Sequence, residues 1–259
     1  MVGPDSSLQP VPLRVVPEDV TAEAADLVFA GRYIPAGAGP EPIAGDFYDL
    51  FRLDDDLLAL VVGDVAGHGS AATGRMQQLR AATRAYAVES QSPAGVIARL
   101  DQFSARLDPE AIATIWYGQY QPSTGTLAYA NAGHPPPVLT AHQAPTLLLH
   151  ATTSPPLGAG VTGDDVAEHR QVLPPGAILV AYSDGLIERR GTDFDDQLAL
   201  LTTVVTTACD PGRNATANDI AAEILTALVP DPDRAEDDIC LLVVRRQPLD
   251  ISGLGRVRP

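Results

Sequence analysis

The chain has 259 residues, of which 45% are hydrophobic, enough to bury one large core or two small ones. Its formal net charge of −16 argues against a nucleic-acid partner, because binding to phosphate backbones needs concentrated Lys and Arg. No stretch approaches the roughly 18 consecutive apolar residues of a membrane-spanning helix, so the composition also argues against a membrane protein.

The two ends of the chain differ from its middle. Residues 1–22 are aperiodic and contain Pro and Ser, which predicts a flexible N-terminal tail, followed by one domain over 23–246 and a C-terminal tail over 247–259. A basic start followed by an apolar run is missing, so we expect no secretory signal and a cytoplasmic location. Cys209 and Cys240 lack metal-site spacing and are typical of small core residues in a reducing compartment.

Strand-like runs open the domain and two helical segments follow. We predict strands at 27–34, 47–53 and 57–62. The acidic residues 54–56, between the last two runs, are typical of a tight hairpin turn. Apolar residues then recur at spacings of four and three up to about Glu89, which predicts a helix. Ser92-Pro93 opens a second helix, because Pro suits the first helical position.

The second half begins with a predicted hairpin, in which a Pro-Ser-Thr-Gly turn joins 112–120 to 127–130. Further short strands are predicted at 138–140, 146–149, 166–172 and 177–183. Two helices are predicted at 195–208 and 217–228, the latter capped by Asn214 or Thr216, before a last strand at 239–244. Hairpins outnumber βαβ crossovers, which favours an α+β fold.

Aspartates stand beside the ends of several apolar runs. Asp64 follows 57–62 and is flanked by Gly63 and Gly67, and Asp184 follows a similar run. The remaining members of the set are Asp46, Asp237 and Asp238. A single such aspartate is usually a turn or cap residue, but a buried ionised carboxylate is costly without a cation or several donors. An all-oxygen set of this kind indicates Mg²⁺ or Mn²⁺ rather than Zn²⁺.

Six motifs, in order, resemble those of SpoIIE/RsbU-type serine phosphatases, which belong to the metal-dependent PPM protein phosphatases. They are Gly45-Asp46-Phe47-Tyr48-Asp49, Gly63-Asp64-Val65-Ala66-Gly67-His68-Gly69, Asn131-Ala132-Gly133-His134-Pro135-Pro136, Pro156-Leu157-Gly158, Ser183-Asp184-Gly185-Leu186-Ile187-Glu188 and Asp237-Asp238. The resemblance covers about residues 28–246. It implies a four-layer α-β-β-α sandwich, in which two antiparallel sheets are flanked by helices.

The resemblance also implies a site for two Mn²⁺ or Mg²⁺ ions. Asp64 would bridge both ions, and the backbone carbonyl of Val65 would complete one coordination sphere. Asp184 and Asp237 would bind the first ion, with Asp238 as the alternative to Asp237. Asp46 would face the second ion, directly or through water. A hydroxide between the ions would attack phosphorus, so no side-chain nucleophile is expected.

The chain departs from the family pattern at two places. The usual double glycine before the first aspartate is Ala44-Gly45. Eukaryotic-like members carry a histidine two residues after the bridging aspartate, where this chain has Ala66. We interpret His68 as a helix-start residue that orients the loop and His134 as a structural turn histidine, not as general acids.

Relatives of this type usually dephosphorylate phosphoserine or phosphothreonine on an anti-anti-sigma (STAS-domain) protein in sigma-factor regulation and the stress response. The resemblance therefore implies a phosphorylated protein partner, and regulation by an attached domain or a homodimer. The helix beginning near Ser70 is the candidate regulatory element, because it joins the metal loop directly. Two alternatives stay open: a catalytically weak partner-binding module, and a phosphohydrolase for small molecules.

Overall fold

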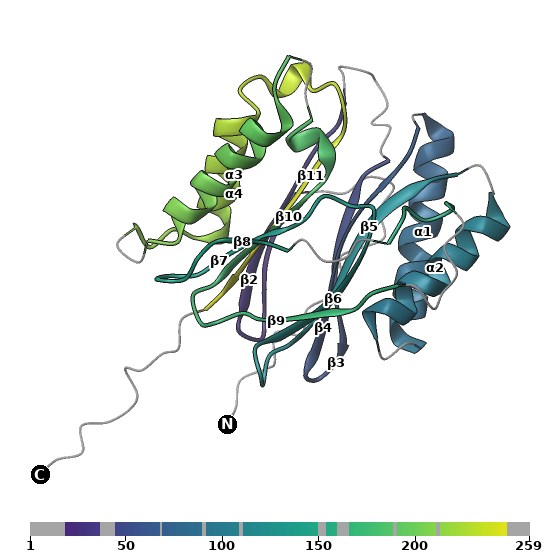
Figure 1. The fold of residues 1–259 in the computed structure, drawn as a ribbon, viewed down its shortest axis with the longest axis horizontal. Helices are drawn as coiled ribbons and strands as arrows, with labels where there is room; N and C mark the ends of the chain where they lie inside the picture. The colour runs from purple at the N-terminus through teal and green to yellow at the C-terminus, as the bar shows by residue number, and fades with distance from the viewer. Residues whose placement is uncertain are drawn as a thin grey trace, which may run out of the picture.

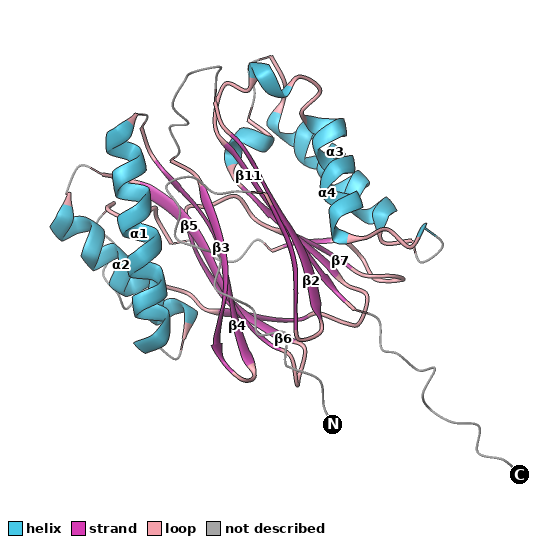
Figure 2. Ribbon diagram, turned by 180° about the vertical axis from the view of Figure 1, so that it is seen from behind, coloured by secondary structure: helices cyan, strands magenta, loops and turns pink. Residues whose placement is uncertain are grey.

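Two antiparallel sheets pack face to face, and a pair of helices covers the outer face of each (Figures 1 and 2). This computed structural model describes residues 19–36, 45–67, 69–89, 92–108, 111–149, 154–159, 166–188, 191–210 and 213–247. The predicted α-β-β-α sandwich is therefore confirmed.

Each sheet combines strands from distant parts of the chain. The six-stranded sheet has the order β1 (Val20–Ala24), β2 (Leu27–Ile34), β11 (Ile239–Arg246), β10 (Ile178–Tyr182), β7 (Val138–Thr140) and β8 (Leu147–Leu148). The five-stranded sheet has the order β3 (Phe47–Asp54), β4 (Leu57–Val65), β5 (Ala113–Gln121), β6 (Thr126–Ala132) and β9 (His169–Val172). The predicted strands from residue 27 onward are confirmed, within a few residues at their ends.

Each sheet is covered by its own pair of helices. Helices α1 (Ser70–Glu89) and α2 (Pro93–Leu107) cover the five-stranded sheet, whereas α3 (Phe194–Ala208) and α4 (Ala217–Leu228) cover the other (Figure 2). Thr216, not Asn214, caps α4, because its side chain and that of Asp219 form a reciprocal capping box. Two short 3₁₀ helices that the sequence did not predict are η2 (Asp184–Leu186) and η4 (Pro232–Arg234).

Alternating side chains divide the core into layers. In β3, Tyr48 and Leu50 pack between the sheets, whereas Phe47 and Phe51 face the helices α1 and α2. Trp116 is fully buried between the sheets. In the described part of the chain, no helix has both the length and the apolar character that crossing a membrane would need.

Strand β1 begins at Val20, inside the segment predicted as an N-terminal tail. It pairs antiparallel with β2 through a tight turn in which Ala25 has a φ of 54°. The prediction missed this strand because an edge strand is held by backbone hydrogen bonds and needs little hydrophobic alternation. Asp54 is also part of β3, so the hairpin turn is shorter than the three acidic residues predicted.

Candidate metal centre

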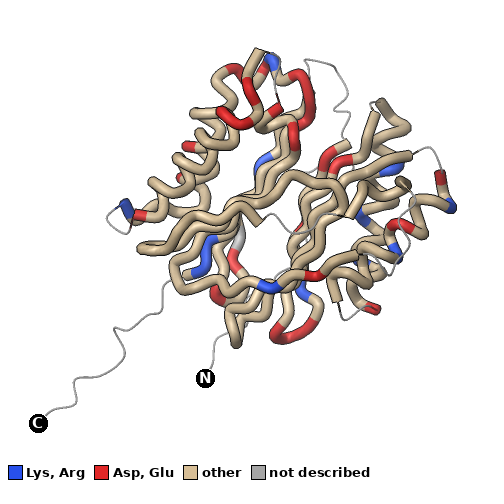
Figure 3. The backbone as a smooth tube through the Cα atoms, in the orientation of Figure 1, with Lys and Arg blue, Asp and Glu red and all other residues tan. Residues whose placement is uncertain are grey.

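The candidate aspartates come from both sheets and lie at one end of the sandwich. Asp46 immediately precedes β3 and Asp64 lies near the end of β4, and the pairing of Phe47 with Gly63 brings the two together. In the other sheet, Asp184 follows β10 and Asp237 precedes β11, strands that are hydrogen-bonded neighbours. Figure 3 shows acidic residues of both halves at this end of the molecule and others at the opposite end.

Burial, together with charges of neighbouring carboxylates, raises the pKa values of these aspartates. Burial, and then the charge of Asp64, raises the pKa of Asp46 well above its ordinary value. Burial also raises the pKa of Asp64; the interaction with Asp46 lowers it, and the charges of Asp237 and Asp238 raise it. Asp184 reaches a pKa of about 6, through burial and then the charges of Asp64 and Asp237. These shifts mean that the cluster lacks positive charge, which a divalent cation would supply.

Two carboxylate oxygens at this end have no hydrogen-bond partner among the described residues. They are Oδ2 of Asp46 and Oδ1 of Asp184, and both are buried. Buried polar atoms are costly when unpaired, so these oxygens suit a hard cation that accepts oxygen ligands. No three His, Cys, Asp or Glu side chains of the described residues converge into a ready coordination sphere. A cation here would therefore also need backbone and water ligands, as Mg²⁺ sites usually do.

The backbone carbonyl of Val65 lies close to the Asp64 carboxylate. The Gly45 carbonyl accepts a hydrogen bond from the Val65 amide at 3.2 Å. A Cβ at Gly45 would come within 2.6 Å of the Val65 carbonyl oxygen and 3.4 Å of Asp64 Oδ1. The glycine thus leaves open the space in front of two oxygens proposed as ligands. The Ala66 amide donates to the Ile112 carbonyl at 2.9 Å and holds the loop in place.

The adjacent Asp237 and Asp238 have different surroundings. Asp238 Oδ1 accepts a hydrogen bond from the Ala36 amide at 2.8 Å, and Oδ2 accepts one from the Gly45 amide at 3.0 Å. Asp237 accepts a hydrogen bond from the Asp238 amide at 2.8 Å and lines a cavity. This geometry favours Asp237 as the ligand and gives Asp238 a structural role.

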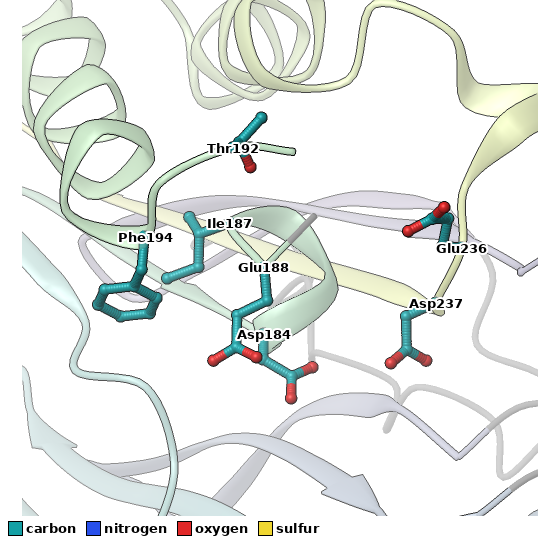
Figure 4. Close-up of a pocket in the computed structure, with 7 residues that line it drawn as sticks. All are labelled: Asp184, Ile187, Glu188, Thr192, Phe194, Glu236 and Asp237. Carbon is teal, nitrogen blue, oxygen red and sulfur yellow. The ribbon is translucent and has the colours of Figure 1, made fainter. Parts of the chain in front are cut away.

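A surface cavity of about 680 Å³ opens beside Asp184 and Asp237. Its other described lining residues are Ile187, Glu188, Thr192, Phe194 and Glu236. Figure 4 shows the carboxyl groups of Asp184, Glu188 and Asp237 pointing toward the same space. Glu188 and Glu236 were not predicted as site residues. Glu188 stands inside the motif that starts at Ser183, which was the available signal.

Of the two histidines in the motifs, the structure describes His134. His68 lies outside the described residues. His134 is buried in the turn after β6, with Nδ1 2.7 Å from Thr114 Oγ1. Burial lowers the pKa of His134 to about 3, so its imidazole is neutral at physiological pH. It is not a lining residue of the cavity.

A buried ion cluster lies on the helix side of β3 and was not predicted. The Asp49 carboxylate accepts hydrogen bonds from Arg84 Nε at 2.6 Å and Nη2 at 2.7 Å. Arg80 Nε donates to the same carboxylate at 3.4 Å. Asp49 belongs to the first motif, yet these contacts join α1 to β3 and do not involve the metal centre.

The sequence model of the family Stage II sporulation protein E (SpoIIE) matches residues 54–247. Protein IcfG of Synechocystis is 27% identical over 234 residues, which cover 79% of this chain and 36% of IcfG. Phosphoserine phosphatase RsbP of Bacillus subtilis is 28% identical over 151 residues, which cover 56% of this chain and 37% of RsbP. The matched region is therefore little more than a third of either relative.

A solved structure with the same fold contains the RsbU and RsbW domains of Rv1364c from Mycobacterium tuberculosis. It superposes with a TM-score of 0.75 and 28% identity, over 85% of this chain and 60% of that one. Sequence and structure comparisons thus agree with each other and with the order of the six motifs.

Proposed function

Because this chain belongs to the SpoIIE family of PP2C-type serine phosphatases, we propose that it hydrolyses phosphoserine or phosphothreonine on a protein with the help of two divalent cations. The observation that carries the proposal is the meeting of aspartates from both sheets at one end of the sandwich. Their pKa values are raised, and two of their buried oxygens have no partner among the described residues.

Asp64 is the residue best placed to share two cations, because its carboxylate interacts with Asp46 on its own sheet and with Asp184 across the sandwich. Asp184 and Asp237 would hold the first ion, the Val65 carbonyl would complete a coordination sphere, and Asp46 would face the second ion. When bound, Mn²⁺ or Mg²⁺ would activate a water and neutralise phosphate charge.

The chain's own residues shape the space for the phosphate. The Val65 carbonyl is kept in place by Gly45 and by the Ala66–Ile112 hydrogen bond. The cavity is lined by carboxylates and by Thr192 among the described residues. We propose direct attack by water on phosphorus, without a phosphoenzyme, because the carboxylates would serve as ligands of the cations that activate the water.

The proposed substrate is a phosphorylated STAS-domain anti-anti-sigma protein, which the family resemblance implies. RsbP, a relative of this chain, is a phosphoserine phosphatase by name. Regulation by an attached domain or a homodimer is also proposed, because the curated relatives extend well beyond the matched region.

A substrate panel tests the proposal. The chain is incubated with Mn²⁺ and either phosphorylated STAS proteins, phosphoserine peptides, p-nitrophenyl phosphate or nucleotides, and phosphate release is measured. We expect the highest kcat/KM for a phosphorylated STAS protein. Faster turnover of nucleotides would indicate a small-molecule phosphohydrolase. Mn²⁺ binding without turnover of any substrate would indicate a partner-binding module.

A further inference from the structure

His134 lies where the chain crosses from one sheet to the other. Strand β6 of the five-stranded sheet ends at Ala132, and β7 of the six-stranded sheet begins at Val138 (Figure 1). The crossing occurs at the end of the sandwich that carries the aspartates, because Ala132 pairs with Ile115, which in turn pairs with Gly63. A residue in this connection can therefore contact both halves of the metal centre.

On one side the imidazole contacts the strand next to Asp64. His134 Nδ1 is 2.7 Å from Thr114 Oγ1, and Thr114 is the β5 residue paired with Asp64 on β4. A neutral imidazole has one donor and one acceptor nitrogen. We assign the hydroxyl as donor to Nδ1, which leaves the hydrogen on Nε2.

On the other side the connection contacts the strand that leads to Asp184. Tyr182 Oη donates to the Pro136 carbonyl at 3.1 Å, and Tyr182 stands two residues before Asp184. Burial lowers the pKa of His134, and the Tyr182 backbone acts in the opposite direction and raises it. Nε2 is buried and has no hydrogen-bond partner within the described residues.

The backbone of His134 is fixed as firmly as its ring. Asn131 Nδ2 donates to the His134 carbonyl at 2.8 Å, and Asn131 Oδ1 accepts from the His134 amide at 2.8 Å. Gly133 has a φ of 66°, and a Cβ there would come within 2.6 Å of Pro156 Cγ. The imidazole is thus held in one orientation between the two sheets.

We propose that His134 is a positioning residue that sets the separation between β4, which carries Asp64, and β10, which leads to Asp184, and so determines the affinity of the site for divalent cations. This inference rests on the proposed function, because it assumes that both aspartates bind metal. The imidazole contacts neither the cations nor the substrate. Its contribution is to fix the connection, which contacts Thr114 of one sheet through the imidazole and Tyr182 of the other through the Pro136 carbonyl.

The test measures Mn²⁺ affinity by isothermal titration calorimetry, next to the urea-unfolding midpoint of each metal-free protein. His134→Ala and Thr114→Val are expected to weaken Mn²⁺ binding by about tenfold or more, as outer-shell changes do. His134→Gln is expected to restore part of the affinity, since an amide offers both an acceptor and a donor. The double variant His134→Ala/Thr114→Val should be no weaker than the weaker single variant, because both changes remove one contact.

Leu58→Ala is the matched control. Leu58 is fully buried between the sheets at the opposite end of β4, so its truncation lowers stability without touching the proposed spacing. We expect its Mn²⁺ affinity to stay within about twofold of wild type. Equal Mn²⁺ affinities of wild type, His134→Gln and Thr114→Val would overturn this inference but not the proposed function. A loss of Mn²⁺ affinity in Leu58→Ala equal to that in His134→Ala would do the same. A wild-type chain that binds no Mn²⁺ would overturn the proposed function and this inference with it.

Discussion

The Asp238 carboxylate accepts a hydrogen bond from the Gly45 amide at 3.0 Å, between residues 193 positions apart in the chain. Its second oxygen accepts from the Ala36 amide at 2.8 Å. Asp238 therefore connects the start of β11 to the residue just before Asp46. Its neighbour Asp237 instead turns its carboxylate toward the cavity (Figure 4). Adjacent aspartates thus divide the structural role from the proposed metal-binding role.

Replacing each of these two aspartates by Ala should separate the two roles. Asp238→Ala leaves the buried Gly45 amide without its acceptor, so we expect the free energy of unfolding in EDTA to fall by about 1–3 kcal/mol. Asp237→Ala should change that free energy less, because removal of a repelling charge offsets the loss of the part-buried hydrogen bond from the Asp238 amide. It should also abolish the stabilisation by Mn²⁺. Urea unfolding with EDTA and with Mn²⁺ measures both quantities. The opposite pattern would exchange the two assignments.

The pH dependence of stability should report the repulsion around Asp184. Its pKa is raised from 3.8 to about 6 in the fold, so the folded metal-free protein holds this proton more tightly than the unfolded chain. Stability is therefore lost as pH rises from about 4 through 6. Relative to Asp184→Asn, we expect the wild-type free energy of unfolding to fall by on the order of 1 kcal/mol over this pH range. The loss is no larger because water screens the partly exposed side chain.

Urea midpoints of wild type and Asp184→Asn, measured in EDTA between pH 4 and 7, test this prediction. Taking the difference between the two proteins removes the contribution of His134, whose lowered pKa destabilises the fold as pH falls below 6.5 in both. A difference that does not change with pH would contradict the assigned repulsion.

The buried Asp49 should be important for stability and not for chemistry. Asp49→Asn removes the charge that compensates Arg80 and Arg84, and Arg80 is almost completely buried. We expect the free energy of unfolding to fall by about 3 kcal/mol, as it does when other buried ion pairs are broken. Arg84→Met should cost less, because Arg84 is partly exposed and Arg80 still faces the carboxylate. Equal unfolding midpoints for Asp49→Asn and wild type would contradict this account.

A methyl group at Gly45 should weaken metal binding through the backbone. The added Cβ would lie 2.6 Å from the Val65 carbonyl oxygen, so the loop must move away from the proposed ligand position. We expect Gly45→Ala to weaken Mn²⁺ binding by about tenfold or more in a calorimetric titration.

Gly74 in α1 provides the control, because a Cβ there meets no atom within 4 Å. Gly74→Ala should raise stability by about 0.5–1 kcal/mol, through helix propensity, and leave Mn²⁺ affinity unchanged. Identical Mn²⁺ affinities of Gly45→Ala and Gly74→Ala would exclude a role for the Val65 carbonyl.

The fold was predictable because its signals are local. The apolar runs of β3 and β4, the Ser92-Pro93 start of α2 and the motif order each depend on short stretches of sequence. Strand β1 was missed because its partner β2 supplies backbone hydrogen bonds that leave little trace in side-chain pattern.

The site was predictable only in part. The positions of Asp64 and Asp184 at strand ends are visible in the sequence, but the choice between Asp237 and Asp238 is not. That choice depends on which carboxylate meets the amides of Ala36 and Gly45, far away in the chain. The contact between His134 and Thr114 is equally non-local, because it appears only when the connection after β6 folds back over β5.

The most direct test of the metal centre is the Mn²⁺-dependent release of phosphate from a phosphoserine protein by wild type, Asp64→Ala and Asp184→Ala. We expect EDTA to abolish wild-type activity and Mn²⁺ to restore it. Both variants should lose activity by about a hundredfold or more. The lost charge stabilisation of the transition state amounts to several kcal/mol, and about 1.4 kcal/mol corresponds to a tenfold change in rate. Circular dichroism confirms that the variants are folded. Folded variants that retain wild-type turnover would contradict the assignment of Asp64 and Asp184 as metal ligands.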